Sequence, residues 1–261
     1  MKIVVCIKQV PDTAEVKLDP KTNTLIRDGV PSIINPDDKA GIEVALRLKE
    51  QVGGTVTLVC MGPPQADVAL REALAMGCDD AVLISGREFG GSDTLATSTI
   101  IAAGIKTLDY DVIITGRQAI DGDTAQVGPQ IAEHLGIPQV SYAEELTADG
   151  DSLIVKRQFE DRYQLLKVKT PCLITALSEL AQPRYMTVSG IVNAYNKEVK
   201  VLTFEDVKNN LNPDFIGLKG SPTNVKQSFT KQVKGAGTVI NVSADEAVKT
   251  IMDKLIEKHI I

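Results

Sequence analysis

The feature that most constrains the fold is an alternation of short apolar runs with longer helix-like stretches over the first two-thirds of the chain. The apolar runs, which we predict to be strands, cover residues 3–7, 56–61, 81–84, 112–115 and 138–142. They are almost continuously apolar, which is typical of strands whose sheet is covered by helices on both faces. The helix-like stretches cover residues 37–54, 65–77 and 92–108. This order predicts an α/β fold with a doubly wound, mostly parallel sheet.

The pattern changes near residue 145. Residues 152–177 indicate a hairpin followed by a further strand, and residues 181–202 indicate a loop and a helical piece. Residues 209–238 are rich in Gly, Pro, Asn and Lys, and we expect an extended arm that lies on another surface. An amphipathic helix capped by Ser243 follows, and it could dock on a partner or on its own domain. We therefore expect an α/β domain over residues 1–180 and a C-terminal part over residues 181–261.

Composition excludes several classes of function. A net charge of -6 and an aromatic content of 4% without tryptophan argue against nucleic-acid binding. No apolar run approaches the roughly 18 residues of a membrane span, and the first residues lack the pattern of a signal peptide, so we expect a cytoplasmic protein. The four cysteines form no CxxC pair and the two histidines are far apart, so we expect no metal site.

The segment "ITGRQAIDGDTAQVGPQIAEHLGIP" is the strongest candidate for a binding loop. In open parallel sheets, ligands bind beyond the carboxyl ends of the strands. The loop contains neither a GxGxxG nor a Walker A pattern, and it has no lysine. Phosphate could still bind to backbone N–H groups near Val127, at the start of the following helix. Asp121 and Asp123 would then serve as helix caps or as acceptors for ribose hydroxyls.

A second glycine-rich loop, "FGGSDT", also leads into a predicted helix at Ser92 and Asp93. Two such loops suggest one ligand with two ends, or two ligands. Arg87 and Arg117 precede the glycines and are natural cations for a phosphate or a reduced flavin. When each loop is taken alone, ordinary turn chemistry is the better explanation of its residues. No nucleophile and base are paired in the sequence, so we expect no catalytic residues.

Together with these loops, the segments "VVCIKQVPD", "INPDDKAGIEVALRLKE", "LVCMGPP", "REALAMGCDDAVLI" and "PRYMTVSGI" closely resemble the beta (small) subunit of electron-transfer flavoproteins, from residue 1 to about residue 205. The resemblance implies a fold like that of the adenine nucleotide alpha hydrolases. It also implies a heterodimer with an alpha subunit, which holds an electron-carrying FAD and which the C-terminal arm wraps. The positions that match the family's nucleotide site are Cys6, Asn35, Pro36, Asp37, Asp38, Met61, Gly62, Gly116, Arg117, Gln118, Ala119, Ile120, Asp121, Gly122, Asp123, Thr124, Ala125, Gln126 and Val127.

The family has two branches, which differ in the nucleotide held by the beta subunit. One holds a structural AMP. The other holds a second FAD, which accepts a hydride from NADH and divides the electrons between a high-potential and a low-potential acceptor. Gly122 favours the FAD branch, because AMP-binding relatives commonly carry a bulkier acidic residue there. The second glycine-rich loop also resembles the FAD branch, through Phe89, Gly90, Gly91, Ser92, Asp93 and Thr94.

The resemblance also implies partners beyond the alpha subunit. "PRYMTVSGI" is similar to the loop that docks acyl-CoA dehydrogenases or related enzymes, with Val188 as an exposed apolar anchor. The docking residues would be Tyr185, Met186, Thr187, Val188, Ser189, Gly190 and Ile191. Ferredoxin or flavodoxin would be the low-potential acceptor, and NADH oxidation would require the alpha subunit and partners. A stand-alone nucleotide-binding regulatory module is the remaining alternative, and the long arm argues against it.

Overall fold

The computed structural model describes residues 1–12, 31–225, 235 and 237–261. The contacts divide the chain into two units, Met1–Lys226 and Gln227–Ile261. The first unit contains the sheet and therefore carries every predicted nucleotide-binding residue. It extends beyond the expected boundary at residue 180, because residues 188–223 pack on the α/β domain through a helix, a strand and several short turns.

Within the described residues, the first unit is built on a nine-stranded sheet in the order β11-β5-β4-β1-β6-β10-β7-β8-β9. The pairs from β11 to β7 are parallel, and β7, β8 and β9 pair antiparallel. The strands are β1 Lys2–Ile7, β4 Thr55–Met61, β5 Asp80–Ile84, β6 Val112–Gly116, β7 Gln139–Asp149, β8 Ser152–Gln158, β9 Tyr163–Lys169, β10 Cys172–Ala176 and β11 Val199–Leu202. A small antiparallel pair joins β2 Gln9–Pro11 to β3 Ser32–Ile34. The predicted fold class, a mostly parallel α/β sheet, is confirmed.

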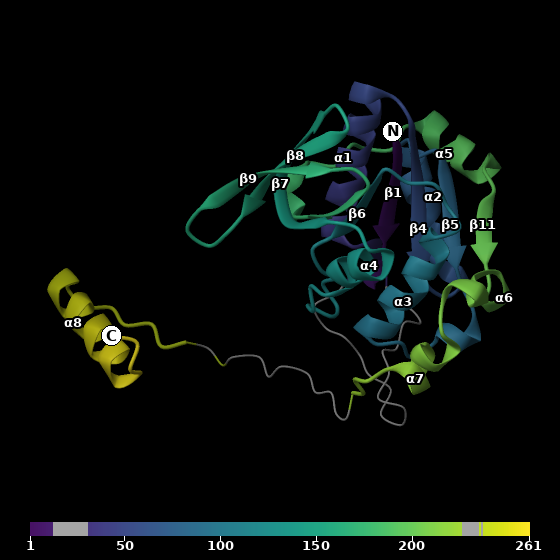
Figure 1. Cartoon of the computed structure of the whole chain (residues 1–261). Coiled ribbons are helices and arrows are strands. Elements are labelled where there is room, and N and C mark those ends of the chain that lie inside the picture. Colours follow the sequence, from purple (N-terminus) through teal and green to yellow (C-terminus); the bar gives the residue numbers. More distant parts are fainter. Residues whose placement is uncertain (13–30, 226–234, 236) are drawn as a thin grey trace. The chain divides into compact units, whose positions relative to one another are not determined.

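Helices cover both faces of the parallel part of the sheet (Figure 1). One face carries α1 Pro36–Val52 and α2 Asp67–Met76, and α5 Val188–Asn196 packs against α2. The other face carries α3 Thr94–Ile105 and α4 Val127–Leu135. The remaining helical pieces are η1 Pro64–Ala66, η2 Arg87–Phe89, η3 Ser178–Leu180, α6 Phe204–Val207, η4 Lys208–Asn210, η5 Pro213–Phe215 and α7 Gly217–Gly220.

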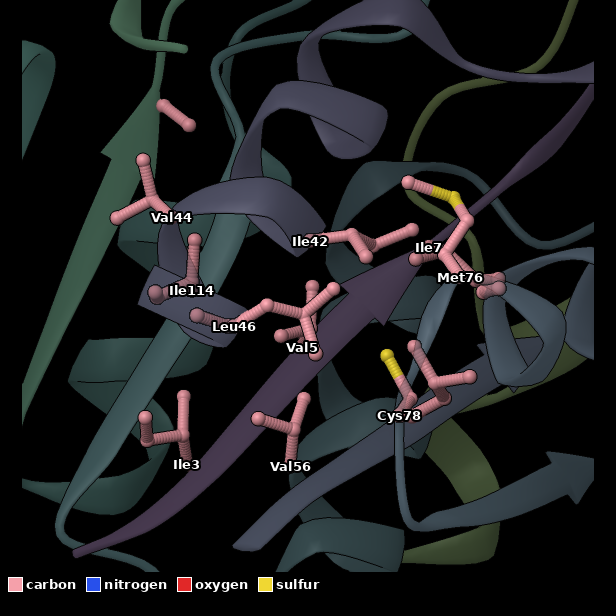
Figure 2. Packing of buried hydrophobic residues seen from close by; sticks show 14 of the residues in the cluster. Ile3, Val5, Ile7, Ile42, Val44, Leu46, Val56, Met76, Cys78 and Ile114 are labelled. Atoms are coloured by element: carbon pink, nitrogen blue, oxygen red, sulfur yellow. The ribbon is translucent and has the colours of Figure 1, made fainter. Parts of the chain in front are cut away.

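Strand β1 shows why the core has two halves. Its successive side chains point to opposite faces of the sheet, so Val5 packs toward α1 while Val4 and Cys6 pack toward α3 and α4. Figure 2 shows the first half, where Val5 faces Ile42 and Leu46 of α1. Because every residue from Ile3 to Ile7 is buried, the run reads as continuously apolar in the sequence.

The structure corrects the expectations for two strands. The strand expected at residues 138–142 continues to Asp149, so residues 146–149 belong to β7 rather than to a polar turn. The loop and helical piece expected at residues 181–202 ends in β11, a strand at the edge of the sheet. Leu202 is the only buried residue of β11, and this short, mostly exposed strand therefore lacks a clear apolar pattern.

The arm expected at residues 209–238 also differs from the prediction in its first half. Leu218 N donates to Gly90 O at 3.0 Å, and Asp93 N donates to Ser221 Oγ at 2.9 Å, so residues up to Thr223 lie on their own domain. Residues 226–234 and 236 of the expected arm lie outside the described residues. In the second unit, Ser243 caps α8 Ala244–Glu257 as predicted, and the apolar side chains of Val248, Ile251 and Ile256 are exposed.

Candidate functional site

Two cavities open at the carboxyl ends of the parallel strands. The first, here called the α4 cavity, has a volume of about 370 Å³ and lies between the end of β6, the loop that follows it and the start of α4. The second, here called the β5 cavity, has a volume of about 840 Å³ and lies beside the ends of β4 and β5. Lys8, Met61 and Ser92 line both cavities. The two spaces therefore meet at the edge of the sheet where ligands bind in open parallel α/β folds.

Most predicted nucleotide-binding residues line these cavities. Those on the α4 cavity are Cys6, Asp38, Met61, Ser92, Asp93, Thr94, Gly116, Arg117, Gln118, Ala119, Gly122, Thr124, Ala125, Gln126 and Val127. Those on the β5 cavity are Met61, Gly62, Phe89, Gly90, Gly91 and Ser92. The predicted residues that line neither cavity are Asn35, Pro36, Asp37, Ile120, Asp121 and Asp123. The predicted segments therefore lie together at these cavities, and their role in binding a nucleotide stays a prediction.

Asn35 is one of the residues that hold the loop. Its side-chain amide donates to Gln118 O at 2.8 Å and accepts from Ile120 N at 3.1 Å. A single side chain thereby satisfies one backbone C=O and one backbone N–H within a three-residue span. Since Asn35 is fully buried, breaking either bond would leave a polar group of its side-chain amide unpaired. Asn35 therefore fixes the path of the loop and does not face the ligand space.

Asp38 fixes the ends of two strands. Its carboxylate accepts from Lys8 N at 2.8 Å, just after β1, and from Gly116 N at 2.9 Å, at the end of β6. Burial raises the pKa of Asp38 to about 7, although the two backbone donors act in the opposite direction. A Cβ atom at Gly116 would lie 2.2 Å from Asp38 Oδ1, so a side chain at this position would break the contact.

Asp121 and Asp123 do not act as helix caps, contrary to one of the interpretations above. Both carboxylate oxygens of Asp121 accept from Lys8 Nζ, at 2.7 and 2.9 Å. Asp123 Oδ1 accepts from Gln118 Nε2 at 2.8 Å. Both carboxylates are therefore paired with other side chains, and neither residue lines the α4 cavity. Their negative charges are kept off the ligand space, which removes the apparent conflict with phosphate binding.

The loop carries backbone strain next to the cavity. Asp123 and Ala125 have φ angles of 47° and 51°, in the left-handed region. For a residue with a Cβ atom, this conformation costs about 1–2 kcal/mol. Such strain persists only where the surroundings fix it, and it occurs often at ligand sites. Here Gln118 Nε2 donates to Asp123 Oδ1, and the side chains of Asn35 and Lys8 bind residues that precede Asp123.

The start of α4 faces the α4 cavity without a side-chain cap. The first N–H groups of a helix have no acceptor within the helix, and the helix dipole makes this end attractive to anions. Val127 and Gly128 both line the cavity. A Cβ atom at Gly128 would lie 2.5 Å from Thr115 Oγ1, so this glycine lets α4 approach β6 closely. The arrangement suits a phosphate group held by backbone amides, as predicted from the sequence.

The second glycine-rich loop has a different role in packing. Gly91 adopts a φ angle of 74°, and a Cβ atom there would lie 3.0 Å from the Leu218 side chain. Asp93 caps α3 by accepting from Ala96 N at 3.0 Å, as predicted. The conformation of Gly91 is thus explained by the segment packed on it. The role of this loop in holding a flavin or NADH stays a prediction.

Arg117 supplies a cation to the α4 cavity. Its Nε atom lies 3.5 Å from Asp37 Oδ2, and neither atom has a hydrogen-bond partner among the residues that the structure describes. Burial raises the pKa of Asp37, and the charge of Arg117 opposes that effect. On the same cavity wall, burial raises the pKa of the Cys6 thiol, which therefore stays neutral and presents a small apolar surface.

Comparison with known proteins identifies the family. A family model described as electron transfer flavoprotein domain matches residues 22–207. The chain is 60% identical, over 261 residues and the whole of both chains, to electron transfer flavoprotein subunit beta of Clostridium acetobutylicum. The chain belongs to the electron transfer flavoprotein beta-subunit family. The resemblance predicted from the sequence is thereby confirmed, and the family implies flavin-related electron transfer.

Two further relatives of the beta subunit carry more specific names. The chain is 53% identical over 268 residues to acryloyl-CoA reductase electron transfer subunit gamma of Anaerotignum propionicum. It is 52% identical over 264 residues to caffeyl-CoA reductase-Etf complex subunit CarD of Acetobacterium woodii. Both matches cover 100% of this chain and of the relative.

The predicted docking residues of the beta subunit form an exposed apolar segment before and within α5. Tyr185 and Val188 are 94% and 82% exposed, and Val192 and Tyr195 continue the apolar surface along the helix. Thr187 caps α5 by accepting from Gly190 N at 2.9 Å. The segment is therefore a defined helix start that presents large side chains to solvent, a feature common at interaction sites.

Arg184 anchors this segment to α1. Its backbone N–H and its Nε atom both donate to Glu43 Oε2, at 3.1 and 2.8 Å, and its Nη2 atom reaches Glu50 Oε2 at 3.3 Å. These contacts hold the pKa of Glu43 below its usual range, even though burial acts in the opposite direction. The exposed segment therefore begins next to a residue that is bonded to α1.

Sequence reasoning missed several residues of the site. Lys8 lines both cavities and binds Asp121, but it follows a strand in a segment that was matched only through Cys6. Thr97, Ile101 and Ile131 line the α4 cavity from the buried sides of α3 and α4. The helical periodicity of each segment could have identified them, because it places these residues on the same helix face as the first turn.

Among the residues that the structure describes, no helix is long and apolar enough to cross a bilayer. In the same residues, no group of three or more His, Cys, Asp or Glu side chains is arranged to hold a metal ion.

Proposed function

We propose that the chain is the beta subunit of a heterodimeric electron-transfer flavoprotein that binds FAD in the α4 cavity. The observation that carries this proposal is the uncapped start of α4, which opens on a cavity that shares Lys8, Met61 and Ser92 with a second, larger one. The first cavity would hold the nucleotide end of the ligand at the amides of Val127 and Gly128. The second adds the room that a dinucleotide needs beyond a mononucleotide. The partner alpha subunit would hold the other FAD.

The residues present fit such a ligand. When bound, FAD would supply the redox chemistry, accepting a hydride from NADH and releasing the electrons to a high-potential and a low-potential acceptor. Arg117 and the α4 amides would neutralise phosphate charge, while Lys8 and Gln118 keep the carboxylates of Asp121 and Asp123 occupied. Cys6, Ile101 and Ile131 would exclude water from the inner wall of the α4 cavity. Ferredoxin or flavodoxin would take the low-potential electron.

A structural AMP is the second candidate. The α4 cavity alone, at about 370 Å³, falls within the usual size range of small-molecule sites. In that case the amides of α4 would hold the single phosphate, and the chain would be a carrier subunit without a reaction of its own. The full-length match to proteins named as subunits supports either candidate over a stand-alone module.

The cofactor content of the purified heterodimer tests the proposal. The chain is produced together with its alpha subunit, the complex is denatured, and the released nucleotides are separated and quantified. Two FAD per heterodimer is the expected result. One FAD and one AMP would replace the first candidate with the second. A beta subunit that stays monomeric when produced with its alpha subunit would contradict the heterodimer itself.

We further propose that the segment from Tyr185 to Ile191 docks an acyl-CoA dehydrogenase-type partner. The relatives named after acryloyl-CoA and caffeyl-CoA reductases support this class of partner. In Arg184→Met the side-chain bonds to Glu43 and Glu50 are lost and only the backbone N–H of residue 184 can still donate to Glu43, so the exposed segment samples more conformations before docking. We expect the KM for the partner to rise several-fold, with kcat and cofactor content unchanged.

Arg47→Met is the matched control, because Arg47 also binds Glu43, at 2.8 Å, but only along α1. An equal rise in KM for both variants would show that Glu43, and not the docking segment, is responsible.

A further inference from the structure

Lys8 joins the first strand of the sheet to the binding loop at the point where the two cavities meet. Its backbone N–H donates to Asp38, and its Nζ atom donates to both carboxylate oxygens of Asp121. The Asp121 side chain is only 7% exposed, whereas that of Lys8 is 45% exposed. The cation therefore reaches inward from a half-exposed position to neutralise a nearly buried carboxylate.

The loop is held at successive points by residues from two other segments. Asp38 binds Gly116 N, Asn35 binds Gln118 O and Ile120 N, and Lys8 binds Asp121. Beyond Asp121 the backbone enters the strained stretch at Asp123 and Ala125, which leads to the start of α4. Among the residues that the structure describes, Lys8 supplies the last side-chain contact from another segment before that strained stretch.

We infer that Lys8 is a positioning residue, whose ion pair with Asp121 holds the loop in the shape that exposes the α4 amides to the nucleotide. Removal of the ammonium group leaves the Asp121 carboxylate nearly buried and without a cation, which is unfavourable. The carboxylate then turns toward water and draws the backbone of Ile120 with it. Since the strained residues that follow depend on fixed neighbours, the loop relaxes and the α4 amides lose their alignment. This inference rests on the proposed function only for the identity of the ligand.

A double-mutant cycle separates this role from direct contact with the ligand. The complex of the full chain with its alpha subunit is stripped of nucleotide, and the affinities for FAD and AMP are measured by calorimetry. In Lys8→Met, both affinities fall about tenfold, a value reduced by the partial exposure of Lys8. In Lys8→Met with Asp121→Asn, affinity recovers to within about threefold of the original, because no buried charge remains. Lys8→Arg, which keeps the cation, recovers it as well.

Hydrogen exchange of the nucleotide-free complex measures directly how well the loop is held. Amides of residues 118–126 exchange faster in Lys8→Met than in the original chain, and slow again in the double variant. Lys39→Met is the control, since it removes the Lys39–Glu72 ion pair on the same domain, at 2.6 Å, without a contact to the loop.

Unchanged exchange in Lys8→Met, or affinity that stays low in the double variant, would overturn the inference and make Lys8 a direct ligand contact or a bystander. If the unaltered complex binds neither FAD nor AMP, the proposed function fails, while the exchange data still decide what Lys8 does to the loop.

Discussion

Helices α3 and α4 both begin at the α4 cavity, but their first turns are satisfied in different ways. Asp93 caps α3, accepting from Ala96 N at 3.0 Å and from Thr223 N at 2.9 Å. Gln126, at the corresponding position of α4, gives no cap and instead accepts from Thr94 Oγ1 at 2.8 Å. One helix start is closed by a carboxylate of its own chain, and the other is open.

The difference shows how one local geometry can serve two purposes. A helix N-terminus attracts negative charge whether the charge comes from a side chain or from a ligand. At α3, the Asp93 carboxylate occupies that position and also fixes residues 221–223. At α4, the two nearby carboxylates are engaged with Lys8 and Gln118 instead. We conclude that an anion is expected at α4 and not at α3, although both starts follow glycine-rich loops.

The largest expected effect comes from closing α4 in the manner of α3. In Gln126→Asp, the new carboxylate would cap the first turn and place a negative charge where a phosphate would bind. Because like charges in such a site cost several kcal/mol, we expect nucleotide affinity to fall roughly 100-fold, with stability unchanged or higher. Calorimetry on the nucleotide-free complex measures it. Gln126→Asn, a neutral cap, is the control, and equal losses in both variants would show that charge is not the cause.

The second prediction concerns Asp38, which anchors the loop before α4 by accepting from two backbone N–H groups, at Lys8 and at Gly116. Asp38→Asn replaces one acceptor oxygen by an amide group, so one of the two backbone donors at Lys8 and Gly116 loses its partner. Leaving a buried donor unpaired costs about 2 kcal/mol of unfolding free energy. Denaturant unfolding at pH 5 measures this loss. An unchanged midpoint would show that the bonds from Asp38 to the two backbone donors do not stabilise the fold.

The same variant tests the raised pKa of Asp38. With a folded-state pKa of about 7 and an ordinary value of 3.8, the native chain holds a proton that the unfolded chain has already released. The contribution of Asp38 to stability is therefore fully present below pH 3.8 and is lost as the pH rises through about 7. The difference in unfolding free energy between the original chain and Asp38→Asn should therefore become smaller as the pH rises from 3.8 to about 7. A difference that stays constant over this range would argue against a raised pKa of Asp38.

The comparison also explains what the sequence could and could not predict. Asp93 was identified as a cap because capping residues lie next to the helix that they cap. The pairing of Asp121 with Lys8 joins residues 113 positions apart, and no local pattern in the loop reveals it. The same limit applies to Asn35, which was matched to the nucleotide site but supports the loop from behind. The alternation of strands and helices predicted the sheet, whereas β11, with one buried residue, was too weak a pattern to find.

Gly122 tests the space in front of the open helix. It lines the α4 cavity, and a Cβ atom there would meet nothing within 4 Å, so larger side chains fit without strain on the fold. In Gly122→Glu, we expect FAD affinity to fall about tenfold and AMP affinity to fall less, since the added side chain occupies room of which the longer ligand needs more. Calorimetry with each nucleotide measures both. Gly122→Ala controls for size alone, and an equal loss for FAD and AMP would remove Gly122 as a determinant of the choice.

The smallest expected effect comes from removing the side-chain cap at the start of α3. In Asp93→Ala, the cap and the contact to Thr223 are lost, which costs about 1 kcal/mol or slightly more of unfolding free energy. Thr187→Ala is the matched control, because Thr187 caps the nine-residue α5 without binding another segment. The excess loss in Asp93→Ala, read from denaturant unfolding, measures the docking of residues 221–223. Nucleotide affinity should stay within about twofold, since removing a negative charge beside the cavity cannot weaken the attraction of α4 for an anion. A large fall would mean that Asp93 touches the ligand, and that the two helix starts serve one ligand together.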